Sequence, residues 1–136
     1  SGSLGAKLKT VEDLMLIGKK IPFINENESM KKALSIITKK NLGTLIAINN
    51  KNETTGIITD GQIRRKTGEE SNINRKKVRD IMTKNPISVN KDTLVVKALS
   101  IMYNKKITSL RVYSNLNQKR TIGIIHIHNI LENTSN

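Results

Sequence analysis

The chain has 136 residues and a formal net charge of +13, because 24 Lys and Arg outnumber 11 Asp and Glu. This length suits one ordinary domain or two very small ones. The chain contains no cysteine, which excludes disulfides, thiolate zinc sites and cysteine nucleophiles. Its apolar runs are too short to cross a membrane and no secretory leader opens it, so we expect a cytoplasmic protein without a membrane partner.

The positive charge by itself does not indicate a nucleic-acid partner. Lys, Ile and Asn make up 54 of the 136 residues, and their codons are rich in A and T, so mutational bias could produce much of the lysine excess. The chain has three aromatic residues, Phe23, Tyr103 and Tyr113, whereas single-strand binders interleave basic residues with stacking rings. We therefore predict a solvated basic surface and no nucleic-acid binding.

The first half of the chain predicts a short strand, a helix, two strands and a second helix. Asn27 is the expected cap of the first helix, whose apolar stripe follows the spacing i, i+3, i+4, i+7. Leu45–Ile48 and Gly56–Thr59 are the expected strands of a hairpin, and Gly61–Lys66 is the expected second helix. The stripe consists of Met30, Ala33, Leu34 and Ile37.

The same order of elements returns in the second half, after a polar segment, residues 67–77, that we expect to be a linker. Asp92 is the expected helix cap, and the hairpin strands are Leu110–Tyr113 and Thr121–His126. His128–Glu132 is the expected second helix. The apolar stripe of the first helix consists of Val95, Ala98, Leu99 and Met102.

Three blocks of sequence recur between the halves, at offsets of 67, 65 and 67 residues. We therefore predict an α/β fold of the α+β kind, in which two β-α-β-β-α modules pack as a pseudo-twofold pair, since one module is too small to be stable alone. The modules are residues 11–66 and 78–133, joined by the linker 67–77 and flanked by a linker, 1–10, and a tail, 134–136. The recurring blocks are Val11–Met15 with Val78–Met82, Ala33–Ile36 with Ala98–Ile101, and Gly56–Ile58 with Gly123–Ile125.

These blocks resemble the CBS domain, in which a Val-x-Asp-hydrophobic-Met opening precedes an Ala-Leu helix and a Gly-hydrophobic-hydrophobic-Thr strand. Two such repeats in tandem make a Bateman pair, and the resemblance covers residues 11–132. A set of motifs in one order is further similar to the C-terminal CBS pair of the D-arabinose 5-phosphate isomerases. They are Gly2–Leu8, Asn41-Leu42-Gly43, Gly56–Gly61 with Arg64-Arg65, Ile107-Thr108-Ser109, and Gly123–His128.

The resemblance implies a parent enzyme of Kdo and lipopolysaccharide biosynthesis, which interconverts ribulose 5-phosphate and arabinose 5-phosphate. In that family catalysis lies in an N-terminal SIS (sugar isomerase) domain, so we expect this chain to be a fragment without catalytic residues or isomerase activity. Residues 1–10 then join the two domains, although Ser1-Gly2-Ser3 is equally compatible with a cloning scar. The resemblance also implies a homodimer of the fragment and a tetramer of the parent enzyme.

The resemblance further implies a ligand site in the cleft between the repeats. In nucleotide-binding CBS domains, a Thr or Ser at the position of Thr59 contacts phosphate or ribose, and an Asp three residues later holds the ribose hydroxyls. Here Gln62 and Asn129 replace that Asp, and His126 replaces the Thr of the second repeat. Thr59 is therefore either a ligand contact or a simple helix cap, and Asp60 is a cap or turn residue rather than a catalytic acid. The expected ligand set is Thr59, Asp60, Gln62, Arg64, Arg65, Thr108, Ser109, His126, His128 and Asn129.

Two further groups leave alternatives open. His126 and His128 would share a face if both lay on a strand, as metal ligands do, but a third ligand is lacking and we predict no metal. They are instead expected in the cleft, against the SIS domain, or as ordinary polar residues. Seven basic residues between positions 64 and 79 indicate either a solvated face or contact with a phosphate-bearing ligand or an acidic partner subunit.

The preferred hypothesis is a regulatory CBS pair that binds an anionic nucleotide or sugar nucleotide and needs no cofactor. The end product of the implied pathway, CMP-Kdo, is the natural candidate ligand. The rival hypotheses are a structural oligomerisation module without a ligand, which the two missing carboxylates favour, and a stand-alone CBS protein that serves another enzyme or a transporter.

Overall fold

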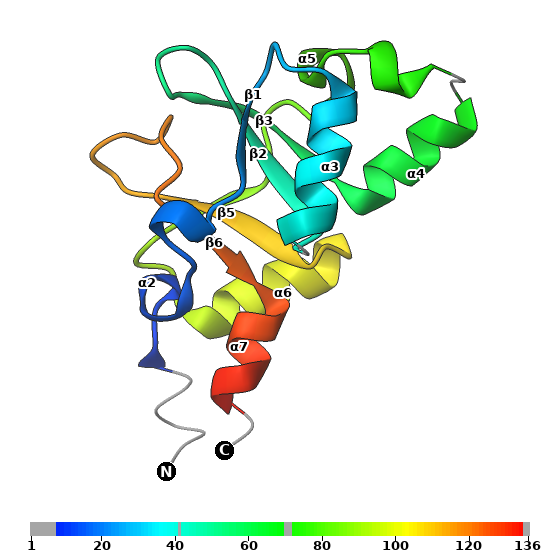
Figure 1. The fold of residues 1–136 in the computed structure, drawn as a ribbon. Coiled ribbons are helices and arrows are strands. Elements are labelled where there is room, and N and C mark those ends of the chain that lie inside the picture. Colours follow the sequence, from blue (N-terminus) through cyan, green and yellow to red (C-terminus); the bar gives the residue numbers. More distant parts are fainter. Residues whose placement is uncertain (1–7, 41, 70–71, 135–136) are drawn as a thin grey trace. The chain divides into compact units, whose positions relative to one another are not determined.

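The computed structural model describes residues 8–40, 42–69 and 72–134 (Figure 1). The chain forms two compact units. The contiguous unit runs from Ile21 to Pro86, whereas the split unit combines the chain up to Lys20 with the chain from Ile87 onward. Most of the expected flanking segments, 1–10 and 134–136, and Asn41 of the motif set lie outside the described residues.

The contiguous unit is a three-stranded mixed sheet with helices packed against it. Strand β1 runs parallel to β2, and β2 runs antiparallel to β3. Helix α3 packs against β2, and α4 packs against β3. The elements are β1 (Phe23–Asn25), α3 (Met30–Lys40), β2 (Thr44–Ile48), β3 (Thr54–Thr59), α4 (Asp60–Glu69), the 3-10 helix η2 (Ile73–Arg75) and α5 (Val78–Ile81).

The split unit repeats this topology with its own sheet, in the order β4-β5-β6. The parallel pair is β4 with β5 and the antiparallel pair is β5 with β6. The α+β fold class and the recurring order of elements are thereby confirmed. The elements are α2 (Val11–Leu14), η1 (Gly18–Lys20), β4 (Ser88–Asn90), α6 (Val95–Lys105), β5 (Ser109–Tyr113), β6 (Gly123–His126) and α7 (Ile127–Thr134).

Each unit has a core that the predicted helical stripe helps to build. In both α3 and α6, three stripe residues are buried and the Leu at i+4 is half-buried. Alternate residues of the strands enter these cores, although successive residues of β2, β5 and β6 are buried. The core of the contiguous unit includes Met30, Ala33, Ile37, Leu45, Ala47 and Ile58, and that of the split unit includes Val95, Ala98, Met102, Leu110, Val112 and Ile125.

The boundaries of the compact units differ from those of the sequence repeats. The reason is that the opening helix of each repeat packs in the unit that contains most of the other repeat. Helix α5 opens the second repeat, yet Val78 belongs to the core of the contiguous unit. Helix α2 opens the first repeat, yet Val11 belongs to the core of the split unit. Backbone hydrogen bonds fix both exchanges: Val78 N–H donates to the Glu28 carbonyl at 2.8 Å, and Val11 N–H donates to the Thr93 carbonyl at 2.8 Å.

The methionine that ends each opening motif explains the glycine of the return strand. A Cβ on Gly56 would lie 2.6 Å from Met82 Sδ and 2.8 Å from the carbonyl oxygen of Thr83. A Cβ on Gly123 would overlap Met15 Sδ in the same way. The recurring Met and Gly are therefore paired contacts between the opening segment of one repeat and the return strand of the other.

The predicted helix caps are wrong. Asn27 and Asp92 lie in turns, where the side chains of Asn25 and Asn90 accept their backbone N–H groups at 2.9 Å. These turns occupy the residues after β1 and β4, so the helices begin later than expected. Ser29 Oγ accepts the Lys32 N–H at 3.2 Å at the start of α3, and α6 begins after Leu94, without a side-chain cap.

The segment predicted as a linker, residues 67–77, contains regular structure. Helix α4 continues to Glu69 and η2 follows. Ile73 of η2 is 7% exposed and belongs to the core of the contiguous unit. The polar composition of the segment concealed this single apolar anchor. Within the ranges described, no helix combines the length and apolar character needed to span a bilayer.

Candidate functional site

The site residues of the contiguous unit gather where β3 ends and α4 begins. Thr59 is the last residue of β3, and its Oγ1 accepts the Gln62 N–H at 3.3 Å, so the hydroxyl caps α4. Asp60 is exposed, and its backbone N–H donates to the Gly43 carbonyl at 3.0 Å. Gly43 has φ +69°, and a Cβ there would lie 2.8 Å from Asp60 Oδ2, so the glycine leaves room for this carboxylate.

Gln62 is the most buried polar residue of this group, at 8% exposed. Its Nε2 donates to the carbonyl of Ile81 in α5. Its Oε1 is buried without a hydrogen-bond partner among the described residues, as is Oγ1 of Thr44, which pairs with Thr59 across the sheet. Buried polar atoms are usually paired, so these two oxygen atoms remain able to form a hydrogen bond.

The equivalent end of the split unit is closed by its own side chains. His126 Nδ1 accepts the His128 N–H at 3.1 Å, and Asn129 Oδ1 accepts the His126 N–H at 2.9 Å. These two bonds form a reciprocal capping box at the start of α7. The His126 and His128 rings stack with centroids 4.8 Å apart.

Burial lowers the pKa of His126 below its ordinary value of 6.5, and the nearby His128 lowers it further. The neutral ring also suits the geometry, since only an unprotonated Nδ1 can accept the His128 N–H. The proton of the neutral ring is then on Nε2, which is a donor.

The expected site residues thus fall into two groups, one on each unit. Besides Thr59, Asp60 and Gln62, the contiguous unit holds Arg64 and Arg65, which are exposed on α4. In the split unit Ser109 is buried and pairs with His126, while the Thr108 carbonyl accepts the Ile127 N–H at 2.8 Å. In neither group do paired acids and bases suggest catalysis.

The described residues contain no group of three His, Asp or Glu placed to hold a metal ion. A backbone N–H already occupies Nδ1 of His126, so only Nε2 of that ring could ligate a metal.

Sequence reasoning missed Arg111, a charged residue that is 6% exposed in β5. Its guanidinium donates to Thr121 Oγ1 at 2.8 Å, Ser88 Oγ at 3.1 Å and the Gln118 carbonyl at 2.6 Å. It also lies 5.6 Å from the Tyr113 ring centre. Desolvation lowers its pKa. The one available signal was an arginine within a predicted strand, at the position that Ile46 occupies in the first repeat.

A comparison with protein families matches the CBS domain twice, at residues 11–69 and 78–136. Among curated proteins, the chain is 37% identical to the arabinose 5-phosphate isomerase KdsD of Francisella tularensis over 134 residues, which cover 97% of this chain and 40% of that enzyme. The KdsD of Escherichia coli K12 is 34% identical over 96% of this chain and 39% of its own length. The chain therefore spans about two fifths of the relatives it matches.

Solved structures of CBS pairs have the same fold. The CBS pair of MJ0100, in complex with 5′-methylthioadenosine and S-adenosyl-L-methionine, aligns with TM-score 0.77 and 25% identity over 92% of this chain and 94% of that one. CBSX2 in complex with AMP aligns with TM-score 0.77 and 23% identity over 90% and 93% of the two chains.

Proposed function

The chain belongs to the CBS domain family as a tandem pair, and we propose that it is the ligand-sensing regulatory region of an arabinose 5-phosphate isomerase. The observation that carries this proposal is the 34–37% identity to such isomerases over nearly the whole chain. Reading the gene upstream of Ser1 tests it. An open reading frame that continues into a sugar isomerase domain supports the proposal, and a start codon or an unrelated domain there overturns it.

The proposed ligand is an anionic nucleotide or sugar nucleotide, with CMP-Kdo as the first candidate. Two CBS pairs of the same fold were solved with adenosine ligands. This chain has the amides of Gln62 and Asn129 where nucleotide-binding CBS domains carry a ribose-binding carboxylate, and both amides already make a hydrogen bond within the chain. Since a hydrogen bond to a charged group contributes about 1.5–3 kcal/mol and a neutral one about 1, we expect AMP and ATP to bind weakly.

Thermal unfolding with added ligand tests this specificity. A ligand at about 100 times its Kd adds roughly 2.7 kcal/mol to the unfolding free energy, so CMP-Kdo should raise Tm by several degrees while AMP and ATP barely change it. The variant Gln62→Asp should gain about tenfold in AMP affinity, because it supplies the missing carboxylate. Asn129→Asp makes the same change at the equivalent position of the split unit, and by the same argument it should also gain AMP affinity. Strong stabilisation of the unchanged chain by AMP or ATP would contradict the carboxylate argument.

Under this proposal the chain regulates and assembles but does not catalyse. We expect no arabinose 5-phosphate isomerase turnover by the purified chain, and turnover above that of a mock preparation would refute the regulatory role. We also expect a homodimer, with α4 and α7 available for the contact. Light scattering at micromolar concentration measures its mass, and a strictly monomeric mass would count against assembly.

The rival function is a structural assembly module without a ligand. The closed capping box of His126, His128 and Asn129 favours it, because Nδ1 of His126 and Oδ1 of Asn129 already accept backbone N–H groups within the chain. If no nucleotide or sugar phosphate raises Tm while the dimer persists, this second function is the better conclusion.

A further inference from the structure

The internal repeat allows the basic residues of one part of the chain to be compared with the matched positions of the other repeat. The cations of α4, η2 and α5 are replaced at almost every matched position of the other repeat. The chain holds seven cations between residues 64 and 79, whereas the seven matched positions hold one cation and two carboxylates. The pairs are Arg64 with Leu131, Arg65 with Glu132, Lys66 with Asn133, Arg75 with Leu8, Lys76 with Lys9, Lys77 with Thr10, and Arg79 with Glu12.

The contiguous and split units hold similar numbers of cations, 13 and 11, so codon bias is sufficient for the totals. It does not explain why seven of the 13 cations lie between residues 64 and 79, where the matched positions hold one. In the part of the chain that the structure describes, Arg64, Arg65, Arg75 and Lys76 are exposed and form no ion pair. These charges do not stabilise the unit through internal salt bridges, which leaves them available to an anion.

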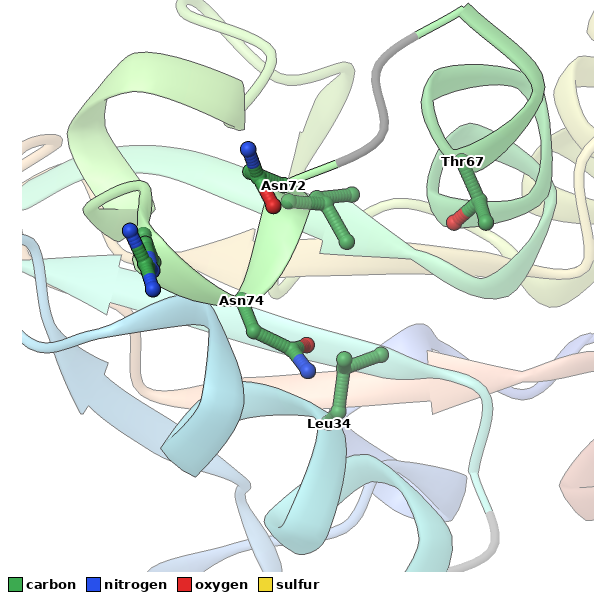
Figure 2. Close-up of a pocket in the computed structure, with 6 residues that line it drawn as sticks. Leu34, Thr67, Asn72 and Asn74 are labelled. Carbon is green, nitrogen blue, oxygen red and sulfur yellow. The ribbon is translucent and has the colours of Figure 1, made fainter.

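A cavity of about 430 Å³ opens within this cationic stretch. Figure 2 shows Thr67 of α4 on one side, Asn72 just before η2, Asn74 within η2, and Leu34 of α3 below them. Ile73 and Arg75 complete the lining. The cavity is lined wholly by the contiguous unit and by none of the residues at the start of α4, so it is separate from the site at Thr59 and Gln62.

The lining offers donors together with an apolar wall. The side-chain amides of Asn72 and Asn74 and the guanidinium of Arg75 make no hydrogen bond to other described residues. The Thr67 hydroxyl, in contrast, already donates to the Ile63 carbonyl at 2.8 Å. Arginine matches the oxygens of a phosphate with two parallel N–H groups, and asparagine amides add further donors. Leu34 and Ile73 provide the surface for an apolar part of the ligand.

We propose that this cavity is a second small-molecule site, which binds a phosphate monoester with its phosphate on Arg75, Asn72 and Asn74 and its apolar part on Leu34. The volume falls within the range of about 300–1,000 Å³ for small-ligand sites. Arg64, Arg65 and Lys76, which are exposed and close in sequence to the lining residues, add positive charge to this part of the unit, so binding weakens as salt rises.

NMR titration of the full chain at constant ionic strength tests the proposal, with inorganic phosphate and phenyl phosphate as the probes. We expect saturable shifts of the Asn72 and Asn74 side-chain amides and of the Arg75 Nε–H, with phenyl phosphate binding at least about threefold more tightly because of the apolar wall. Arg75→Gln should weaken both probes about tenfold or more. Leu34→Ala should weaken phenyl phosphate alone.

Lys97→Gln, which removes an exposed cation from the split unit, is the matched control and should leave both affinities unchanged. Amide spectra of each variant establish that it is folded. Shifts that do not saturate, that spread over lysines of both units, or that persist in Arg75→Gln would overturn the site. The result is independent of nucleotide binding at Thr59, which the variant Gln62→Asp reports.

Discussion

The two units have the same strand order and nearly the same helices, but they differ in how the chain builds them. The contiguous unit is one stretch of sequence, Ile21–Pro86, whereas the split unit needs two segments from opposite ends of the chain. The units also differ locally. The split unit buries Arg111 where the contiguous unit buries Ile46, and its last helix begins with a closed capping box rather than a single Thr cap.

A sequence repeat and a compact unit need not coincide. The opening helix of each repeat supplies a core residue, Val11 or Val78, that is completely buried in the unit built by the other repeat. Because only the split unit includes the N-terminal segment, changes in that segment should destabilise the split unit more than the contiguous unit.

Removal of the residues before Ile21 should have the largest effect, and it should fall on the split unit. This change removes Val11, Leu14 and Met15, which pack in the core of that unit. A fully buried apolar side chain contributes about 1.5–3 kcal/mol, so the loss is on the order of 5 kcal/mol, comparable with the whole stability of a small domain. Hydrogen exchange should show loss of protection in β4–β6 and retention in β1–β3. Equal loss in both sheets would contradict the assignment of α2 to one unit.

Gly56→Ala and Gly123→Ala make the same change at equivalent positions of the two units. Both place a Cβ against a methionine, but at Gly56 the Thr83 carbonyl is 2.8 Å away, while at Gly123 the Leu16 carbonyl is 3.1 Å away. A backbone group yields less readily than a side chain, so we expect Gly56→Ala to cost about 3 kcal/mol and Gly123→Ala about 1–2. Urea unfolding measures both. A larger cost at Gly123 would show that the backbone contact is not decisive.

Arg111→Ala should cost about 2–3 kcal/mol, because it removes three hydrogen bonds and leaves a cavity in the sheet. Arg111→Ile copies the other unit and removes the buried charge together with its desolvation cost. We expect Arg111→Ile to cost less than about 1 kcal/mol, since apolar replacement of a buried charge is often tolerated. Chemical unfolding of both variants separates packing from charge, and equal costs would mean that the guanidinium itself is required.

The smallest effect is the pH dependence of the capping box. The folded pKa of His126 lies below its ordinary value of 6.5, so the unfolded chain binds the proton more readily. The unfolding free energy should therefore be fully retained above about pH 6.5 and fall as the pH decreases below it, by at most about 1.4 kcal/mol per pH unit. His126→Thr, which copies Thr59, should remove this component. A difference between the two proteins that is the same at pH 5 and pH 7.5 would contradict it.

Much of the fold was predictable because it depends on neighbours in the chain. The apolar stripes that begin at Met30 and Val95 predicted the helices, and the pairs of apolar strands predicted the hairpins. The nearly constant offset between recurring blocks predicted the repeat. The site was predictable in part: Thr59 and His126 do lie at equivalent helix starts. The hydrogen bonds of Gln62 and Asn129 were not predictable. Gln62 donates to the carbonyl of Ile81 in the second repeat, whereas Asn129 accepts the N–H of His126 in its own repeat.

The elements, their order and their twofold repetition follow from periodicities within short windows of sequence. Which opening helix completes which core depends on contacts that form only in the folded chain. The segments Val11–Met15 and Val78–Met82 are nearly alike in sequence, and their contacts, with Gly123 and Gly56 respectively, join residues far apart in the chain. Local pattern cannot choose between two nearly equivalent partners; the backbone bonds of the folded units, from Val78 to Glu28 and from Val11 to Thr93, make that choice.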